Sequence, residues 1–443
     1  MESPLLGLVS RLDLLDVAIL MAAGSVLIYC VLSNRLYAVM FILVLSASLV
    51  GTTIPMIEGV ASLVRWLTLP LLLFTGLLFS RVEMSMGLLL FWGYVFLGLV
   101  FMFRAISITW QFQRGLLLLL VAAAISIGYG GRSYRTHKAT LVLIAIAGMF
   151  FAVVNAVTLP TQLAVAGRFA GNSKSAPAMT VILGSLLPFV FWGLWNVESR
   201  ALRLILGLGF LSGMVTLVLS GQRAGTIAGL VGILPLTLTI IKRKEYRAWS
   251  VVLAIASILL GVLLVQRASD EKIYFLLSRY RLDSGLSNRD LIWQIALSEI
   301  ATNPFLGRGI GAAEWVISSS FHNAYLEVWF NAGFLGLGLF VASQAYVFFR
   351  ILRLNRILTD PKTKSVLALA LGYMLGFVVL CAFESVGAGA SNLHVILYLY
   401  LGILVSSGSL FEIASPPLSA STFIPSAHLE PTIVTDHYVA TLS

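Results

Sequence analysis

Long apolar runs alternate with short polar connections along most of this chain. Each run is about 18 to 20 residues long, enough to cross roughly 30 Å of hydrocarbon as a helix. The runs are continuously apolar rather than alternating in polarity, which predicts helices and not the strands of a barrel. Thirteen candidate spans can be placed, at 13–32, 36–52, 60–79, 86–103, 115–130, 139–158, 177–196, 203–219, 225–241, 249–265, 324–349, 365–382 and 393–411. The pattern predicts an all-α polytopic membrane protein with about twelve or thirteen transmembrane helices.

One long polar stretch, residues 267–323, interrupts this alternation and offers room for an active site. We expect a large, partly helical loop there that carries the working residues. The predicted organisation is transmembrane helices with short loops (1–266), the large loop (267–323), further transmembrane helices (324–411) and a tail rich in Ser, Pro and Thr (412–443). The composition of the tail predicts disorder.

The middle of the large loop has the pattern of an amphipathic helix. Ser287 followed by Asp290 has the spacing of a helix N-terminus, with Asp in place of the usual Glu or Gln. Apolar residues then recur at helical spacing, at Ile292, Ile295, Ala296 and Ile300. Pro304 predicts that the helix ends by Asn303, because a residue before proline disfavours the helical conformation. Arg289 would then lie in the first turn, where backbone N–H groups and the helix dipole favour an anion.

Composition supports a membrane protein and excludes other classes. Of the 443 residues, 59% are hydrophobic and 11% are charged, whereas soluble domains carry about 25% charged residues. The net charge of +10 comes from basic residues in short loops between spans, so we do not expect nucleic acid as a partner. Cys30 and Cys381 lie inside apolar runs, where we expect neither a disulfide nor a metal site.

Basic residues in the short loops predict which loops face the cytoplasm, because short cytoplasmic loops are enriched in Lys and Arg. One alternating set of loops holds fourteen: Arg132, Arg135, Lys138, Arg200, Arg203, Lys242, Arg243, Lys244, Arg247, Arg350, Arg353, Arg356, Lys362 and Lys364. The opposite set of short loops holds three: Arg168, Lys174 and Arg223. We therefore expect the first set and the tail in the cytoplasm, and the loop 267–323 on the outer side.

The few arginines predicted on the outer side are candidates for binding an anionic substrate. They are Arg223, Arg289, Arg168, Arg104, Arg114 and Arg308. An arginine near hydrocarbon usually lines a cavity or pairs with another group, and a guanidinium binds phosphate oxygens through a planar fork of donors. For Arg223 and Arg289 together, an anion site is the preferred interpretation. For each arginine alone, snorkelling to the membrane interface is an open alternative.

His322 and Asn323 lie just before the span that begins at residue 324. An imidazole can accept a proton near neutral pH, as a general base that activates a hydroxyl nucleophile must. We therefore take His322 as the candidate catalytic residue and Asn323 as a neighbouring substrate contact. Asn is also a typical helix cap, so a purely structural role at the start of this helix is the alternative for both residues.

The loop shows no pattern for a metal or a cofactor. Its carboxylates are scattered, and it has neither an Asp-x-Asp pair nor a His cluster. The glycine-rich segment 307–311 has no strand before it and lacks the spacing of a phosphate loop. We expect a tight turn there, and chemistry that needs no metal or cofactor.

Several short motifs follow one another in a fixed order. They are Ser220-Gly221-Gln222-Arg223-Ala224-Gly225, Ser287-Asn288-Arg289-Asp290 with Trp293, Asn303-Pro304-Phe305-Leu306-Gly307-Arg308-Gly309, His322-Asn323-Ala324-Tyr325 and Asn331-Ala332-Gly333-Phe334-Leu335-Gly336, with Gly167-Arg168-Phe169-Ala170-Gly171-Asn172 upstream. The ordered combination resembles the O-antigen ligase and O-antigen polymerase superfamily.

The resemblance implies a membrane glycosyltransferase of the C superclass, in the bacterial inner membrane, with its active site facing the periplasm. Such enzymes take a glycan from undecaprenyl diphosphate and pass it to an acceptor sugar, with inversion and without metal. By resemblance, Arg223 and Arg289 hold the diphosphate, and His322 orients or deprotonates the acceptor hydroxyl. Because a diphosphate is a good leaving group, charge stabilisation and positioning can supply most of the acceleration.

The acceptor separates the branches of this superfamily. A ligase uses the lipid A-core oligosaccharide and a polymerase uses a second lipid-linked repeat; one large outer loop in a compact chain favours the ligase. A branch that glycosylates proteins is a further alternative. From another class of protein, a transporter or flippase of the lipid-linked glycan is also an alternative. Transporters often have paired halves with broken helices, and the sequence does not show this pattern. Membrane lipids are the other expected partner, and the sequence does not indicate an oligomeric state.

Overall fold

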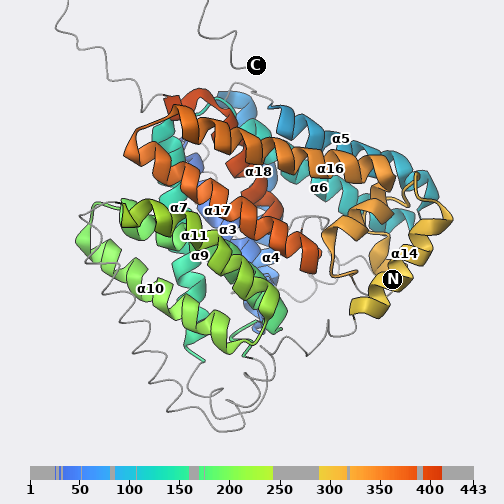
Figure 1. Ribbon diagram of the computed structural model, residues 1–443, viewed down its shortest axis with the longest axis horizontal. Coiled ribbons are helices and arrows are strands. Elements are labelled where there is room, and N and C mark those ends of the chain that lie inside the picture. Colours follow the sequence, from blue (N-terminus) through green and yellow to red (C-terminus); the bar gives the residue numbers. More distant parts are fainter. Residues whose placement is uncertain are drawn as a thin grey trace, which may run out of the picture.

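The computed structural model describes Ser25 and residues 29–30, 33–50, 52–79, 85–105, 107–158, 169–173, 175–242, 289–316, 320–386 and 393–411. The regular elements in these ranges are all helical, and the only bridge outside helices joins Thr52 to Ser173. Figure 1 shows a bundle of long helices, with α14 lying beside one end of α16.

The helix bounds in chain order are as follows. They are α3 Leu36–Leu49, α4 Pro55–Phe79, α5 Met86–Val100, η1 Phe101–Arg104, α6 Ile108–Tyr129, α7 Tyr134–Ala156, α9 Ala176–Asn196, α10 Arg200–Leu219, α11 Arg223–Ile241, α14 Arg289–Thr302, α15 Ala313–Val316, α16 Ala324–Ile357, α17 Pro361–Phe383, α18 Leu393–Ser406 and η3 Gly408–Leu410.

Nine helices in the described ranges are long and apolar enough to cross a membrane: α4, α5 with η1, α6, α7, α9, α10, α11, α16 and α17. Two shorter apolar helices, α3 and α18, join them. These eleven helices coincide with eleven of the thirteen predicted spans. The predicted spans 13–32 and 249–265 fall mostly or wholly outside the described ranges. The predicted fold class, an all-α polytopic membrane protein, is confirmed.

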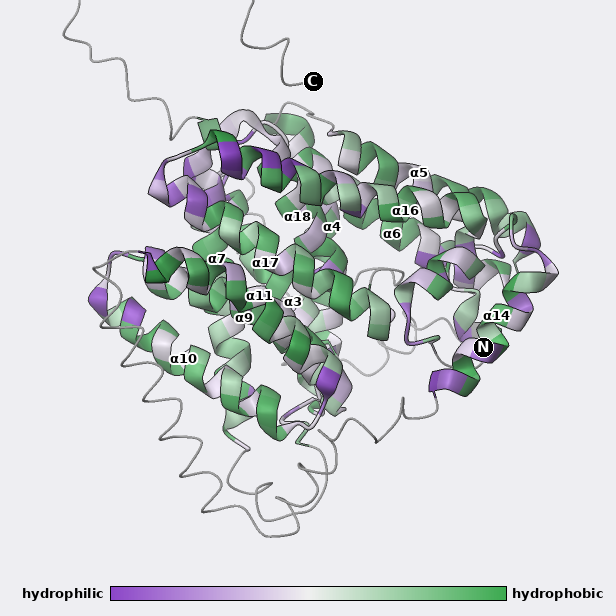
Figure 2. Ribbon diagram, viewed as in Figure 1, coloured by the Kyte–Doolittle hydropathy of each residue, from purple (hydrophilic) through white to green (hydrophobic). Residues whose placement is uncertain are grey.

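Contacts between helix ends show which loops share an end of the bundle. At one end the paired residues are Thr52 with Ser173, Arg104 with Leu306, Arg114 with Glu314, and Gln222 with Glu384. At the other end they are Asn34 with Arg132, Lys138 with Glu198, and Asn196 with Ser365. The first end gathers the loops predicted to lie outside, and the second gathers basic loops predicted to be cytoplasmic. Figure 2 shows hydrophilic residues at helix ends and hydrophobic residues along the helices. Which end faces the periplasm stays a prediction.

Close packing of α11 against α17 brings two outer loops together. A Cβ atom added to Gly372 of α17 would collide with the carbonyl oxygen of Gly232 of α11. Small residues allow helices in lipid to approach this closely. The two helices run in opposite directions, so the N-terminus of α11 lies beside the C-terminus of α17. At that point Gln222 donates a hydrogen bond of 3.0 Å to Glu384.

Helix α16 is broken at Gly333, whose φ of 68° and ψ of −178° are not helical. A residue with a side chain rarely adopts this conformation. The break removes helical partners from nearby backbone groups, and the segment 304–309 supplies new ones. The replacement hydrogen bonds run from Arg308 N to Phe330 O (3.0 Å), Gly309 N to Asn331 O (2.9 Å) and Phe334 N to Pro304 O (3.0 Å). The sequence motifs 303–309 and 331–336 therefore form one structural unit.

Helix α14, Arg289–Thr302, ends where the sequence predicts, directly before Asn303. The predicted N-terminal residue Ser287 lies outside the described ranges. It contributes to a second, smaller hydrophobic core that consists of Ala296, Ile300, Ala312, Ala313, Phe321 and Phe330. Ile295, which the predicted apolar stripe includes, is instead 38% exposed. Trp293 Nε1 donates a hydrogen bond of 3.0 Å to the carbonyl oxygen of Phe321. Helix α14 thereby fixes the segment that leads into His322.

Candidate functional site

The buried carboxylate of Glu384 joins three segments at the predicted outer end. Glu384 follows the last residue of α17. Its Oε1 atom accepts hydrogen bonds from Arg289 Nη2 at 2.7 Å and from Gln222 Nε2 at 3.0 Å. Its Oε2 atom lies 3.1 Å from His322 Nδ1. We call these four residues the Glu384 cluster.

Arg289 opens α14 and points to the end of α17. Besides the ion pair with Glu384, its Nη1 atom donates a 2.6 Å hydrogen bond to the carbonyl oxygen of Phe383. The C-terminal carbonyl groups of a helix carry partial negative charge, which favours a cation there. The guanidinium side chain is only 17% exposed. Arg289 is therefore a paired, largely buried residue and does not simply snorkel, and its fork holds the carboxylate in one orientation.

His322 has a backbone φ of 50°, in the left-handed region that a residue with a side chain rarely occupies. Neighbouring contacts hold it there: the preceding Phe321 is buried, and the following Asn323 caps α16 by accepting a 3.0 Å hydrogen bond from Leu326 N. Asn323 Nδ2 also donates to Ala382 O at 3.0 Å. The helix-cap interpretation is confirmed for Asn323, while the imidazole of His322 turns to Glu384.

The contact with Glu384 sets the chemistry of the imidazole. An ionised carboxylate only accepts hydrogen bonds, so Nδ1 is the donor in this contact, and in the neutral imidazole Nε2 then keeps its lone pair. An imidazole oriented in this way can accept a proton at Nε2, and the carboxylate stabilises the imidazolium that forms. The arrangement is suited to the activation of a hydroxyl group.

The other predicted site residues lie around this cluster or apart from it. Arg223 is the first residue of α11 and is half-buried, directly after Gln222 of the cluster. Arg104 Nη1 donates to Leu306 O at 3.3 Å, so it contacts the segment that fills the break in α16. Arg168 lies outside the described ranges. The structure thus joins Arg289 and His322 through Glu384 and places the backbone of Arg223 beside them.

Arg308, another outer arginine, is engaged elsewhere. Its Nη2 atom lies 2.9 Å from Glu299 Oε2, and its guanidinium lies 5.2 Å from the ring centroid of Phe330. These contacts brace α14 against α16. They indicate a structural role for Arg308.

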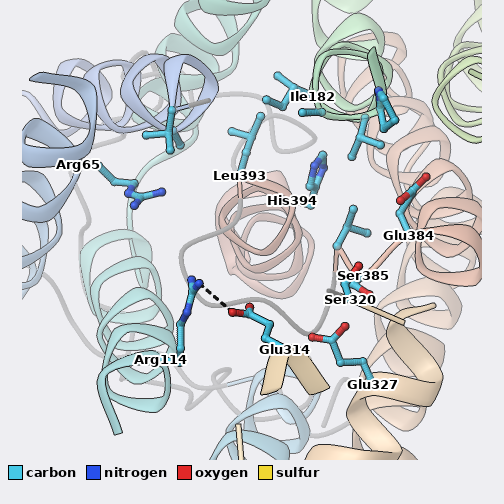
Figure 3. A pocket seen from close by; sticks show the side chains of 16 residues that line it. Arg65, Arg114, Ile182, Glu314, Ser320, Glu327, Glu384, Ser385, Leu393 and His394 are labelled. Carbon is cyan, nitrogen blue, oxygen red and sulfur yellow. Dashed lines mark hydrogen bonds and ion pairs between the residues drawn. The ribbon is translucent and has the colours of Figure 1, made fainter. Parts of the chain in front are cut away.

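A cavity of about 460 Å³ opens beside Glu384 (Figure 3). Its charged and polar lining includes Arg65, Arg114, Glu314, Ser320, Glu327, Glu384, Ser385 and His394. Among the described residues of the loop 267–323, this lining includes only Glu314 and Ser320. The cavity therefore extends beyond that loop into the transmembrane helices.

The residues of the site that were not predicted include Glu384, Gln222, Arg65 and Glu327. Glu384 is far from the other cluster residues in sequence, but it is the one acidic residue between Asp360 and Glu412. An isolated carboxylate after an apolar span is a usable signal, because ionisable groups near lipid are often functional. The same argument applies to Arg65, which interrupts the apolar run 60–79.

Within the described ranges, no group of three or more His, Cys, Asp or Glu side chains could hold a metal ion.

Comparison with known proteins adds one finding. Residues 208–341 match the protein family described as O-antigen ligase. The matched segment includes Gln222, Arg223, Arg289, His322 and Asn323, and it ends before Glu384. No curated protein matches the chain at a significant level.

Proposed function

We propose that the chain is an O-antigen ligase, because its residues 208–341 match the family described as O-antigen ligase. In this proposal it transfers a polysaccharide from undecaprenyl diphosphate to the lipid A-core oligosaccharide. The reaction takes place at the periplasmic face of the bacterial inner membrane. The contact between His322 and Glu384 is the observation that supports transfer chemistry most strongly.

The proposed step is a single displacement with inversion. The acceptor hydroxyl gives its proton to His322 Nε2 while its oxygen attacks the anomeric carbon of the lipid-linked glycan. The bond between that carbon and the diphosphate oxygen breaks, and its electron pair leaves with the diphosphate. Glu384 stabilises the positive charge on the imidazole, which then releases its proton to the leaving group or to water.

Each arginine binds a different group in this proposal or shares the diphosphate with another arginine. Arg289 fixes Glu384, and its remaining N–H groups bind the diphosphate together with Arg223. Arg104 and Arg168 are further contacts of the donor in this proposal. Asn323 keeps His322 in its left-handed conformation through the cap of α16 and the bond to α17.

A deletion strain tests the function, with lipopolysaccharide profiles on gels and the lipid-linked polymer measured together. For a ligase we expect loss of polysaccharide-capped lipopolysaccharide and accumulation of long lipid-linked chains. The wild-type gene should restore the profile, whereas His322→Ala should not. Normal capped lipopolysaccharide in the deletion strain would overturn the proposal.

The same experiment separates the alternatives. A polymerase would share the Glu384 cluster, but its loss would leave single lipid-linked repeats instead of long chains. Loss of a flippase would hold the lipid-linked glycan on the cytoplasmic side. A branch that glycosylates proteins would leave lipopolysaccharide unchanged and remove glycan from protein acceptors.

A further inference from the structure

A buried carboxylate without a hydrogen-bond partner lines the cavity beside the Glu384 cluster. Glu327 lies in the first turn of α16 and is 3% exposed, and its carboxylate points into the cavity (Figure 3). Its Oε2 atom has no hydrogen-bond partner among the residues described. The helix dipole favours a carboxylate in a first turn, but a buried acceptor without a donor is still costly. A hydroxyl group of a bound ligand would supply the missing donor.

Ser385 is a second polar residue of this kind in the same cavity wall. It directly follows Glu384, and it lies near Glu327 in Figure 3. Its Oγ atom is buried and has no hydrogen-bond partner in the described part of the chain. A serine hydroxyl both donates and accepts hydrogen bonds, whereas an ionised carboxylate only accepts them. The two residues together suit the hydroxyl groups of a sugar, which also donate and accept.

The charges around the cavity favour an uncharged ligand. The described lining includes three carboxylates, those of Glu314, Glu327 and Glu384. Arg114 is already paired with Glu314 at 3.2 Å, and Arg65, which also lines the cavity, is not free either. An anionic group placed here would be repelled by the carboxylates. Since sugar hydroxyls carry no charge, a sugar ring avoids this repulsion.

The opposite part of the lining is apolar. It includes Pro177, Ala178, Val181 and Ile182, all in the first turns of α9. A sugar ring presents C–H groups on its faces and hydroxyl groups at its edge, so an apolar wall facing a polar one is suited to it. The cavity of about 460 Å³ is large enough for one such ring, since small-molecule sites measure about 300 to 1,000 Å³.

The two unpartnered residues come from the same segments as the proposed catalytic pair. Glu327 lies five residues after His322, on the helix that Asn323 caps. Ser385 is adjacent in sequence to Glu384, whose Oε2 atom lies 3.1 Å from His322 Nδ1. A sugar bound by Glu327 and Ser385 is therefore held by the segments that position the imidazole.

We infer that the cavity is a subsite for one uncharged sugar ring of a glycan substrate, and that Glu327 and Ser385 bind its hydroxyl groups. This inference rests on the proposed function. Glu327 accepts a hydrogen bond from one hydroxyl, and Ser385 binds a neighbouring one. The sugar belongs either to the acceptor, beside the hydroxyl that His322 activates, or to the lipid-linked donor.

The test measures kcat/KM for glycan transfer by the full-length chain in lipid nanodiscs. The acceptor series consists of acceptor sugars that each lack one hydroxyl, and the donor series removes single hydroxyls from the first sugar of the lipid-linked glycan. The variants are Glu327→Leu and Ser385→Ala. The control is Glu198→Gln, which changes an exposed carboxylate at the opposite end of the bundle. Thermal unfolding checks the fold of each sample, and Glu327→Gln replaces the leucine variant should that variant unfold.

We expect the wild type to use the analogue that lacks the hydroxyl bound by Glu327 at least about tenfold less efficiently than the intact sugar. Glu327→Leu should lower kcat/KM for the intact sugar by a similar factor and should no longer distinguish it from that analogue. The Glu198→Gln control should behave as the wild type. The affected series, acceptor or donor, identifies which substrate occupies the subsite.

A purely structural role of Glu327 would give a different result. A folded Glu327→Leu chain that keeps the wild-type kcat/KM, or one that is slower but still discriminates against every analogue as the wild type does, would overturn the inference. Failure of the proposed function is distinguishable, because the wild type itself would then transfer no glycan to the intact acceptor.

Discussion

Replacement of Glu384 by glutamine is the sharpest perturbation of the site, because it keeps the shape of the side chain and removes its charge. In the wild type, Oε1 receives two donors, from Arg289 and Gln222, and Oε2 faces His322 Nδ1. The amide oxygen of a glutamine would be drawn to the two donors. Its NH2 group would then face Nδ1 and force that nitrogen to act as an acceptor.

The magnitude follows from this reversal of the imidazole. With the proton moved to Nε2, the ring can no longer accept the proton of the acceptor hydroxyl. General base catalysis contributes about 10²- to 10⁴-fold, so Glu384→Gln should lower turnover by about that factor. This corresponds to about 2.7 to 5.5 kcal/mol in the activation free energy.

The assay is glycan transfer by the purified chain in nanodiscs, with donor binding measured on the same samples. Glu198→Gln is the matched control, because Glu198 has a side chain that is 92% exposed and pairs with Lys138 at the opposite end of the bundle. We expect the control to match the wild type. A folded Glu384→Gln chain with wild-type turnover would refute the role given to His322 and Glu384.

Further substitutions test the scaffold and the cluster. Gly333→Ala should lower the free energy of unfolding by at least about 1 to 2 kcal/mol, because the φ of Gly333 is positive and a Cβ atom there would collide with Phe305 O. Thermal unfolding measures this change. Gly338→Ala is the control: Gly338 has open space around it, so the substitution should be neutral or stabilising. Asn323→Ala should lower the unfolding free energy by about 0.5 to 2 kcal/mol through loss of the helix cap, and transfer should fall more than donor binding. Arg289→Lys should reduce turnover at least about tenfold, because an ammonium group cannot reproduce the planar fork of the guanidinium. Wild-type turnover in that variant would contradict the proposal that this fork holds Glu384 in place.

The apolar pattern predicted the bundle because membrane helices follow from the length of each run. The local sequence also predicted α14, because the end of this helix depends on the neighbouring Pro304. It did not predict the break in α16 at Gly333, because that glycine lies within an apolar run that reads as one continuous helix. The partner of the break, the segment 304–309, becomes evident only from the hydrogen bonds between the two.

The candidate site was predicted only in part, because its residues come from segments that are far apart in the sequence. Arg289 and His322 carry recognisable chemistry in short motifs, and the structure joins them. Glu384, the residue through which they meet, comes from a different span, and no local spacing connects it to them. Arg65 and Arg114 face a cavity formed by packed helices. Such a cavity depends on tertiary contacts and not on any single stretch of sequence.

The most direct measurement of the central claim compares turnover of wild-type and His322→Gln chains, purified in nanodiscs with a lipid diphosphate-linked glycan and a lipid A-core acceptor. We predict transfer by the wild type, a loss of at least about 100-fold in turnover for the variant, and nearly unchanged donor affinity. A folded variant that keeps its turnover, or one whose deficit is only weaker donor binding, would contradict proton transfer to His322.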